Sequence, residues 1–131
     1  MNVCFDIDGT ITAEPRFFSL LSHAVRKSGG SVYVVTSRTR TIETLKATRQ
    51  ELKELGIVYT HLYILHDRSE AERICPFNNL DWYEKYIFQK TIYCKANRVD
   101  IYFDDEEKVI NLFRQFLPEV QVFQVHRKGV I

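Results

Sequence analysis

Short apolar runs alternate along this chain with segments of helical period, and this alternation restricts the fold more than any other feature of the sequence. Five β-rich runs are expected to be strands, at the opening run from Val3 and at residues 31–35, 57–65, 99–103 and 120–125. Helical periods predict helices at residues 15–27, 41–55, 82–96 and 106–117. Because strands joined by helices form right-handed crossovers, we expect an α/β, three-layer, Rossmann-like fold with a mostly parallel five-stranded sheet.

Length and composition indicate one ordinary globular domain. The 131 residues fit a single core and are too few for two, so residues 1–131 are expected to form one domain. The chain has 18 basic and 17 acidic residues, which gives a net charge of +1. Since no overall field attracts nucleic acid or a membrane, any binding of a polyanion requires a local patch.

Three features predict a cytoplasmic protein without a membrane partner. No run approaches the ~18 consecutive apolar residues of a membrane span. The first residues lead directly into the opening strand, which leaves no room for a signal peptide. Cys4, Cys75 and Cys94 are odd in number and follow no pattern, so we expect reduced thiols.

The opening strand ends abruptly in two carboxylates, a glycine and a threonine. Ligands of open α/β sheets bind beyond the carboxyl ends of the strands, so Asp6 and Asp8 are expected at the rim of the sheet. A divalent cation would relieve the repulsion between two carboxylates placed there. Gly9 permits a sharp turn whose backbone N–H groups, together with Thr10, can hold an anion. These residue types together suit phosphoryl chemistry.

The sequence of residues 6–10, Asp-Ile-Asp-Gly-Thr after an apolar run, resembles the first motif of the haloacid dehalogenase (HAD) superfamily of phosphohydrolases. This resemblance implies that Asp6 is the nucleophile and that Asp8 is the general acid and base. It also implies that Gly9 and Thr10 contact the substrate. The alternative for the acidic pair alone is a solvated turn, because acidic turns are common.

The second expected strand is followed by Thr36-Ser37-Arg38, which resembles the second HAD motif. The resemblance implies that the Thr36 hydroxyl binds the phosphoryl group, with Ser37 at a position where the family often has glycine. Arg38 could give a phosphate two charge-assisted hydrogen bonds. The alternatives are a helix cap or turn for Thr36 and a solvated side chain for Arg38.

The fourth expected strand ends in residues 104–107, Asp-Asp-Glu-Glu, which resemble the fourth HAD motif. The resemblance implies a magnesium site made by Asp6, Asp104 and the backbone carbonyl of Asp8, an all-oxygen set that suits Mg²⁺. Asp105 is expected to act on this set from outside it. The alternative is that these acidic residues only begin a helix, where they favour the positive end of the dipole.

The third HAD motif is a lysine, and the expected helix at residues 82–96 offers Lys85, Lys90 and Lys95. Helix and strand rises place Lys90 level with the end of the fourth strand, since ~12 Å down the helix offsets ~13 Å up the strand. Lys85 starts ~7 Å above the site and is the second choice, and Lys95 starts about as far below it. The spacing therefore favours Lys90.

The four likenesses occur in family order and together imply a magnesium-dependent phosphatase that forms an aspartyl-phosphate. The intervals between them leave no room for a substantial cap domain. Residues 66–81 are polar and irregular and are expected to form a loop that could serve as a lid. The substrate, the oligomeric state and the pathway are not determined by the sequence.

Several details also resemble the phosphatase domain of polynucleotide kinase-phosphatases, among them residues 34–38, 48–49 and 87–90. This likeness implies a nucleic-acid 3′-end phosphatase as one alternative. The helix at residues 41–55 carries Lys46, Arg49 and Lys53, which could meet a nucleic-acid backbone or, given the interspersed glutamates, form a solvated face. An alternative of another class is a non-catalytic, magnesium-binding regulatory domain on a HAD scaffold.

Overall fold

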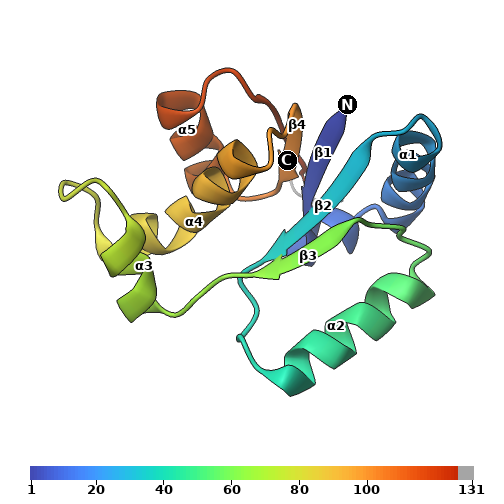
Figure 1. Ribbon diagram of the computed structural model, residues 1–131, viewed down its shortest axis with the longest axis horizontal. Helices are drawn as coiled ribbons and strands as arrows, with labels where there is room; N and C mark the ends of the chain where they lie inside the picture. The colour runs from blue at the N-terminus through green and yellow to red at the C-terminus, as the bar shows by residue number, and fades with distance from the viewer. Residues whose placement is uncertain (127–131) are drawn as a thin grey trace.

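The computed structural model describes residues 1–126 and consists of one parallel sheet between two layers of helices (Figure 1). The strands are β1 (Asn2–Asp6), β2 (Ser31–Thr36), β3 (His61–Ile64), β4 (Ile101–Asp104) and β5 (Gln121–Gln124). Their order in the sheet is β3-β2-β1-β4-β5, and every neighbouring pair is parallel. The predicted α/β, Rossmann-like fold is confirmed, with a sheet that is parallel throughout its described strands.

Helices cover both faces of this sheet, as a parallel sheet requires. They are α1 (Pro15–Lys27), α2 (Ile42–Glu54), α3 (Arg68–Ile74), α4 (Trp82–Ala96) and α5 (Glu107–Phe116). A short broken helical turn, η1 (Ile7–Ile11), follows β1 directly. The described residues contain no inserted cap domain, and none of their helices combines the length and apolar character needed to cross a membrane.

Alternation along the strands divides the core into two apolar clusters. On β1, Val3 and Phe5 face the cluster that contains α1 and α2, whereas Cys4 faces the cluster that contains α4 and α5. Successive side chains of a strand point to opposite faces, so each strand serves both layers. All three side chains are at most 1% exposed, which explains the nearly continuous apolar run at the start of the sequence.

The predicted loop at residues 66–81 is wrong in its first half, because α3 lies there. Asp67 caps this helix by accepting a hydrogen bond from the backbone N–H of Glu70, and Ala71 is fully buried. An Asp followed three residues later by Glu is a signal of a helix start, but the segment is short and largely polar. Its helical state therefore depends on packing against α4.

The predicted third strand is too long at its N-terminal side. The structure pairs only His61–Ile64 with β2, although the apolar run begins at Ile57. The backbone N–H of Ile57 donates to the Leu52 carbonyl and that of Val58 donates to the Ser22 hydroxyl. Since these groups are bonded to α2 and α1, they cannot join the ladder.

All five strands point the same way, so their carboxyl ends share one edge of the sheet. Asp6 ends β1, Thr36 ends β2 and Asp104 ends β4. These three strands are neighbours in the order β2-β1-β4, which places the polar ends side by side. This edge is where ligands of open parallel sheets bind.

Candidate active site

The turn after β1 depends on Gly9, which lies against Asp105 just after the end of β4. Gly9 has a φ of +82°, and a Cβ built on it would lie 2.2 Å from the Asp105 carboxylate. A side chain at this position would therefore be strained and would also collide with Asp105. The Gly9 N–H donates to the Thr12 hydroxyl at 2.9 Å, and the Thr10 hydroxyl donates to Asp6 at 3.1 Å. The predicted contact of Gly9 and Thr10 with an anion stays a prediction.

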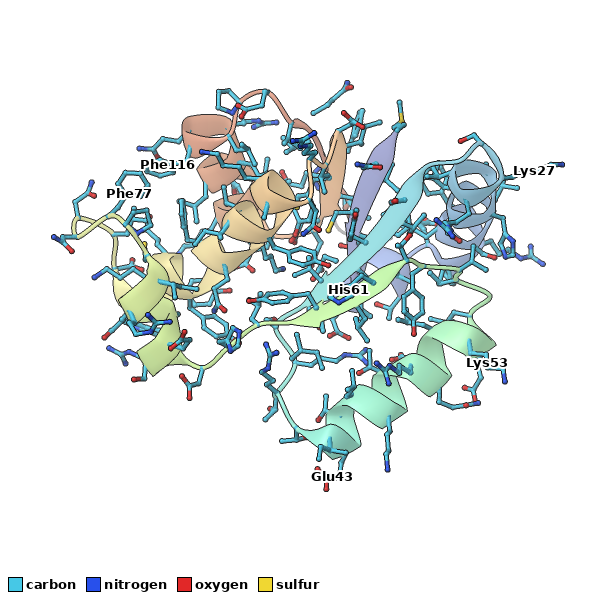
Figure 2. The ribbon with its side chains drawn as sticks, viewed as in Figure 1. Lys27, Glu43, Lys53, His61, Phe77 and Phe116 are labelled. Carbon is cyan, nitrogen blue, oxygen red and sulfur yellow. The ribbon has the colours of Figure 1, made fainter. Side chains whose placement is uncertain are left out.

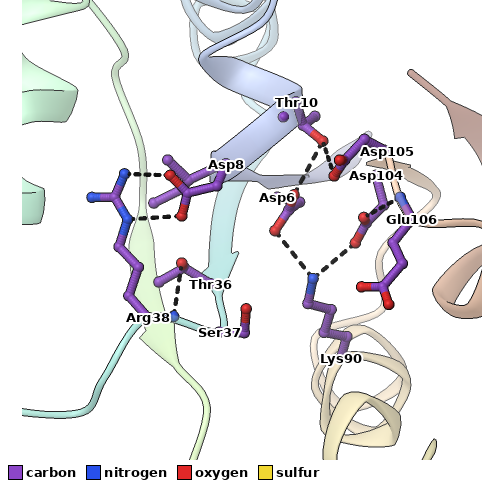
Figure 3. Close-up of polar contacts among 12 residues, drawn as sticks. Asp6, Asp8, Thr10, Thr36, Ser37, Arg38, Lys90, Asp104, Asp105 and Glu106 are labelled. Atoms are coloured by element: carbon purple, nitrogen blue, oxygen red, sulfur yellow. Dashed lines mark hydrogen bonds and ion pairs between the residues drawn. The ribbon is translucent and has the colours of Figure 1, made fainter. Parts of the chain in front are cut away.

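A buried ion network joins β1, α4 and β4 at this edge (Figure 3). Lys90 on α4 donates from Nζ to Asp6 at 3.1 Å and to Asp104 at 2.9 Å. The exposed fractions are 2% for Lys90, 5% for Asp6 and 1% for Asp104. Lys85, the second choice from the sequence, lies five residues earlier on α4, and no hydrogen bond joins its side chain to these two carboxylates. The catalytic role of either lysine stays a prediction.

Further donors fix the Asp104 carboxylate in place. The backbone N–H of Glu106 donates to Asp104 Oδ1 at 2.9 Å, and the buried Tyr102 hydroxyl donates to Oδ2. Tyr102 was not among the residues that the sequence singled out. It lies two residues before Asp104 on β4, and this spacing of two puts both side chains on the same face of the strand.

Burial gives this network unusual proton affinities. Burial raises the pKa of Asp6 above its ordinary value; the Lys90 ammonium opposes this shift, and the Asp104 and Asp105 carboxylates add to it. Burial alone would lower the pKa of Lys90, but Asp6 and Asp104 outweigh it and raise that pKa. The Lys90 ammonium thus contacts two of the three neighbouring carboxylates, and a bound cation would relieve the repulsion that helps to raise the pKa of Asp6.

The carboxylates of Asp6, Asp104 and Asp105 could together hold a metal ion. One oxygen each from Asp6, Asp104 and Asp105 lie within 4.8 Å of one another. A set of carboxylate oxygens suits hard cations such as Mg²⁺ and Ca²⁺, so the donor set fits the group that the sequence predicts. Asp105, expected outside the ligand set, offers an oxygen directly, whereas Asp8 is not a member of the cluster through its side chain. The predicted ligand role of the Asp8 carbonyl is untested.

Asp8 belongs instead to a second, more exposed network. Arg38 donates to both Asp8 oxygens, from Nε at 2.9 Å and from Nη2 at 2.8 Å. Its Nη1 donates to Glu51 at 2.6 Å and to the Thr48 hydroxyl at 3.2 Å, both on α2. The sequence did not single out Glu51, because nothing in the helical period separates it from other glutamates of that helix.

This pairing favours the ionised form of Asp8. Hydrogen bonds from Arg38 lower the pKa of Asp8, and the same bonds raise that of Arg38. A general acid needs a proton to give, so Asp8 can act as one only after Arg38 has turned away from it. Arg38 uses the same fork of donors for Asp8 that it would use for a phosphate.

The residues that end β2 lie between the two networks in Figure 3. Thr36 is 1% exposed, and its hydroxyl accepts a hydrogen bond from the backbone N–H of Arg38 at 3.2 Å. Ser37 is exposed, and its carbonyl accepts a hydrogen bond from the Tyr86 hydroxyl on α4. Which of the two hydroxyl groups meets a phosphoryl group stays a prediction.

Comparisons with known proteins give a fold but no family. No family model matches the chain, and neither does any curated protein. A chain in "Structure of Pnkp1/Rnl/Hen1 complex" is similar with a TM-score of 0.66, and one in "Structure of the Pnkp1/Rnl/Hen1 RNA repair complex" with 0.68. Both are 17% identical over 98% of this chain, which spans only 46% and 43% of theirs.

Proposed function

We propose that this chain is a single-domain, magnesium-dependent phosphatase of the HAD type that hydrolyses a phosphate monoester through an aspartyl-phosphate on Asp6. The observation that carries the proposal is the position of the Asp6 carboxylate, which is bound by Lys90 and lies beside Asp104 and Asp105 at the carboxyl edge of a parallel sheet. A carboxylate nucleophile needs nearby positive charge to bring a phosphate dianion within reach, and both Lys90 and a bound cation would supply it.

In the first chemical step, an Asp6 oxygen attacks phosphorus opposite the ester oxygen. The P–O bond to the leaving group breaks, and the departing alkoxide takes a proton from Asp8. In the second step, a water molecule gives its proton to Asp8 and attacks the same phosphorus, which releases phosphate and regenerates the Asp6 carboxylate. Lys90 and the Thr36 hydroxyl would stabilise the equatorial oxygens as charge shifts.

The cation would be held by Asp6 and Asp104, together with the Asp8 carbonyl that the sequence predicts and the Asp105 carboxylate that lies in the same cluster. When bound, Mg²⁺ supplies charge that neutralises the phosphoryl oxygens. Lys90 binds one oxygen each of Asp6 and Asp104 and keeps both carboxylates together, where they could hold the cation. The rigid support of Asp104 by Tyr102 and Glu106 would keep that set in place.

Arg38 would act as the first contact for the incoming phosphate. Its guanidinium donates from Nη1 to Glu51 and from Nε and Nη2 to Asp8. A substrate phosphate would compete for these donors. Once Arg38 binds the phosphate, it no longer lowers the pKa of Asp8. Asp8 can then carry the proton that the leaving group needs.

A nucleic-acid 3′-end phosphatase is the more specific candidate. Two observations favour it: the chain shares its fold with a chain of the Pnkp1/Rnl/Hen1 RNA repair complex, and its site lacks a cap domain in the described residues. An uncapped site leaves room for a macromolecular substrate, which itself excludes part of the water. The alternative of another class is a magnesium-binding regulatory domain without turnover.

The test is magnesium-dependent hydrolysis of p-nitrophenyl phosphate by the unaltered chain and by Asp6→Asn. Loss of the nucleophile is expected to lower kcat by at least about 10³-fold. Asp100→Asn is the matched control, because Asp100 is exposed and lies at the opposite edge of the sheet, where it accepts from the Asn2 N–H. Retained turnover in Asp6→Asn would exclude the mechanism. Magnesium binding without any turnover in the unaltered chain would favour the regulatory domain.

A further inference from the structure

Two hollows outside the candidate active site form one groove between α2 and the free edge of β3. One hollow, of about 390 Å³, lies over the strand, and the other, of about 720 Å³, lies over the segment that leads from α2 to the strand. Arg49 lines both, so the two hollows are adjacent. We call this the α2–β3 groove; the side chains used below are Arg40, Lys46, Arg49, Lys53, Tyr59, His61 and Tyr63.

The groove is basic along its whole length. Lys46, Arg49 and Lys53 are exposed and follow one another at intervals of three and four residues, so they lie on one face of α2. They cover ~10 Å of helix at 1.5 Å per residue. Figure 2 shows α2, with Lys53 near its end, running beside β3, which carries His61. Among the described residues, no Asp or Glu lines either hollow.

The glutamates of α2 do not cancel this charge at the groove. Glu51 is bound to Arg38, and Glu54 accepts a hydrogen bond from Gln50 at 3.0 Å. Glu43 belongs to the first turn of α2, where an acidic side chain favours the helix dipole. The interspersed glutamates that suggested a solvated face are thus outside the lining of the groove.

Three rings line the groove: Tyr59 lies beside the cations of α2, whereas His61 and Tyr63 belong to β3 and pack toward α4. Tyr59 lines the larger hollow, and His61 and Tyr63 line the smaller one. Tyr63 is held in place by stacking on Tyr93 of α4, with ring centroids 4.5 Å apart and planes 14° apart. His61 is fixed to the same residue by a contact of 2.7 Å between its Nδ1 and the tyrosine oxygen.

Arg40 connects the groove to the candidate active site. It lines the smaller hollow and also a third one, of about 610 Å³, which reaches Ser37 and Arg38 at the end of β2. The Arg40 side chain is anchored by a hydrogen bond of 2.5 Å from Nη1 to the Ile64 carbonyl. A chain of hollows therefore leads from Arg38, across Arg40, to the cations of α2.

We propose that the α2–β3 groove binds the sugar-phosphate backbone of a single-stranded nucleic acid whose phosphorylated end enters the site at Asp6. The proposal rests on the proposed function, since it names the macromolecule that carries the phosphate. Cations at regular intervals match the phosphates of a strand, and the Tyr59 ring, which shares the larger hollow with them, offers a face for an unpaired base.

The test is direct binding of a fluorescent, single-stranded 12-nucleotide probe with a 3′-phosphate, measured by anisotropy in EDTA so that no turnover occurs. The groove variant is Lys46→Ala/Arg49→Ala/Lys53→Ala. The control, Lys27→Ala/Lys95→Ala/Arg114→Ala, removes the same charge from exposed helical positions outside the groove. All six sites accept alanine because it is the best helix former. Thermal unfolding of both variants checks that they are folded.

The groove variant is expected to bind at least about ten-fold more weakly than the unaltered chain, and the control is expected to bind as the unaltered chain does. The slope of log Kd against log salt should fall by about 2, because each lost phosphate contact of a single strand contributes ~0.7. Equal losses in both variants would reduce the effect to general charge and overturn the proposal. So would absence of binding, or tighter binding of poly-glutamate or heparin than of the probe.

These outcomes are independent of catalysis. If p-nitrophenyl phosphate is not hydrolysed but the probe binds through the groove, the proposed reaction fails and the groove remains. If the ester is hydrolysed with magnesium but the groove variant binds the probe normally, the phosphatase remains and the groove is excluded.

Discussion

The two carboxylates of the opening motif lie in opposite environments although only one residue separates them. Asp6 is 5% exposed and bound to the buried ammonium of Lys90, whereas the Asp8 side chain is 61% exposed and bound to the guanidinium of Arg38. Burial raises the pKa of the first, and hydrogen bonds from arginine lower that of the second. The comparison shows that position along the turn, rather than residue type, sets the chemistry of each carboxylate.

The two networks are also expected to differ in how much stability is lost when one of their members is removed. Removing one member of a buried ion network leaves charges without partners in a medium of low dielectric constant. Removing one member of an exposed pair leaves charges that water can solvate. Substitutions in the inner network should therefore alter stability, whereas those in the outer network should act mainly on turnover.

The largest effect is expected for Lys90→Met. The buried Asp6 and Asp104 carboxylates would lose their shared ammonium, which should cost about 3–5 kcal/mol of unfolding free energy, measured by urea denaturation. Lys85→Met is the control on the same helix, because Lys85 is only half-buried. Millimolar Mg²⁺ should stabilise the Lys90 variant more than the unaltered chain, since a cation can replace the lost charge. Equal stability of the two variants would contradict the importance of the inner network.

A smaller loss is expected for Tyr102→Phe. This change removes only the hydroxyl that donates to Asp104, and a hydrogen bond to a buried charge is worth about 1.5–3 kcal/mol. Denaturation should report that loss, and a magnesium titration should show weaker binding because Asp104 is less firmly held. Tyr33→Phe, at a half-buried tyrosine of β2 in the same apolar cluster, is the control. A Tyr102 variant that retains both properties would show that the hydroxyl is dispensable.

The smallest effect on stability is expected for Glu51→Gln in the outer network. The change weakens the ion pair with Arg38 Nη1, and a half-buried pair of this kind, which water still screens, contributes about 1 kcal/mol. The ratio kcat/KM for a phosphate ester should nevertheless fall several-fold, because Arg38 would be less well oriented. Glu54→Gln, one turn later and exposed, is the matched control. If both variants turn over alike, Glu51 does not orient Arg38.

The sequence alone predicted the order of the five strands and of the helices α1, α2, α4 and α5. It also favoured Lys90 over Lys85 from rises along helix and strand, and the role of Lys90 stays a prediction. It failed at α3, since a short polar segment has too weak a period to predict a helix without its packing partner α4. The prediction that Asp105 acts from outside the ligand set is untested, and its carboxylate lies in the acidic cluster. Gly9 leaves the space that this carboxylate occupies.

What the amino-acid order determined by itself is the alternation that makes a parallel sheet and the placement of aspartates where its strands end. Both follow from local rules, because the period of a strand or helix is fixed within each segment and a helical crossover between consecutive strands makes them parallel. Only the tertiary structure decided that Arg38 would bind Asp8 and Glu51 and that Arg40 and α2 would border a groove. Such pairings depend on side chains brought together from distant segments, and their geometry is set by how the helices pack on the sheet.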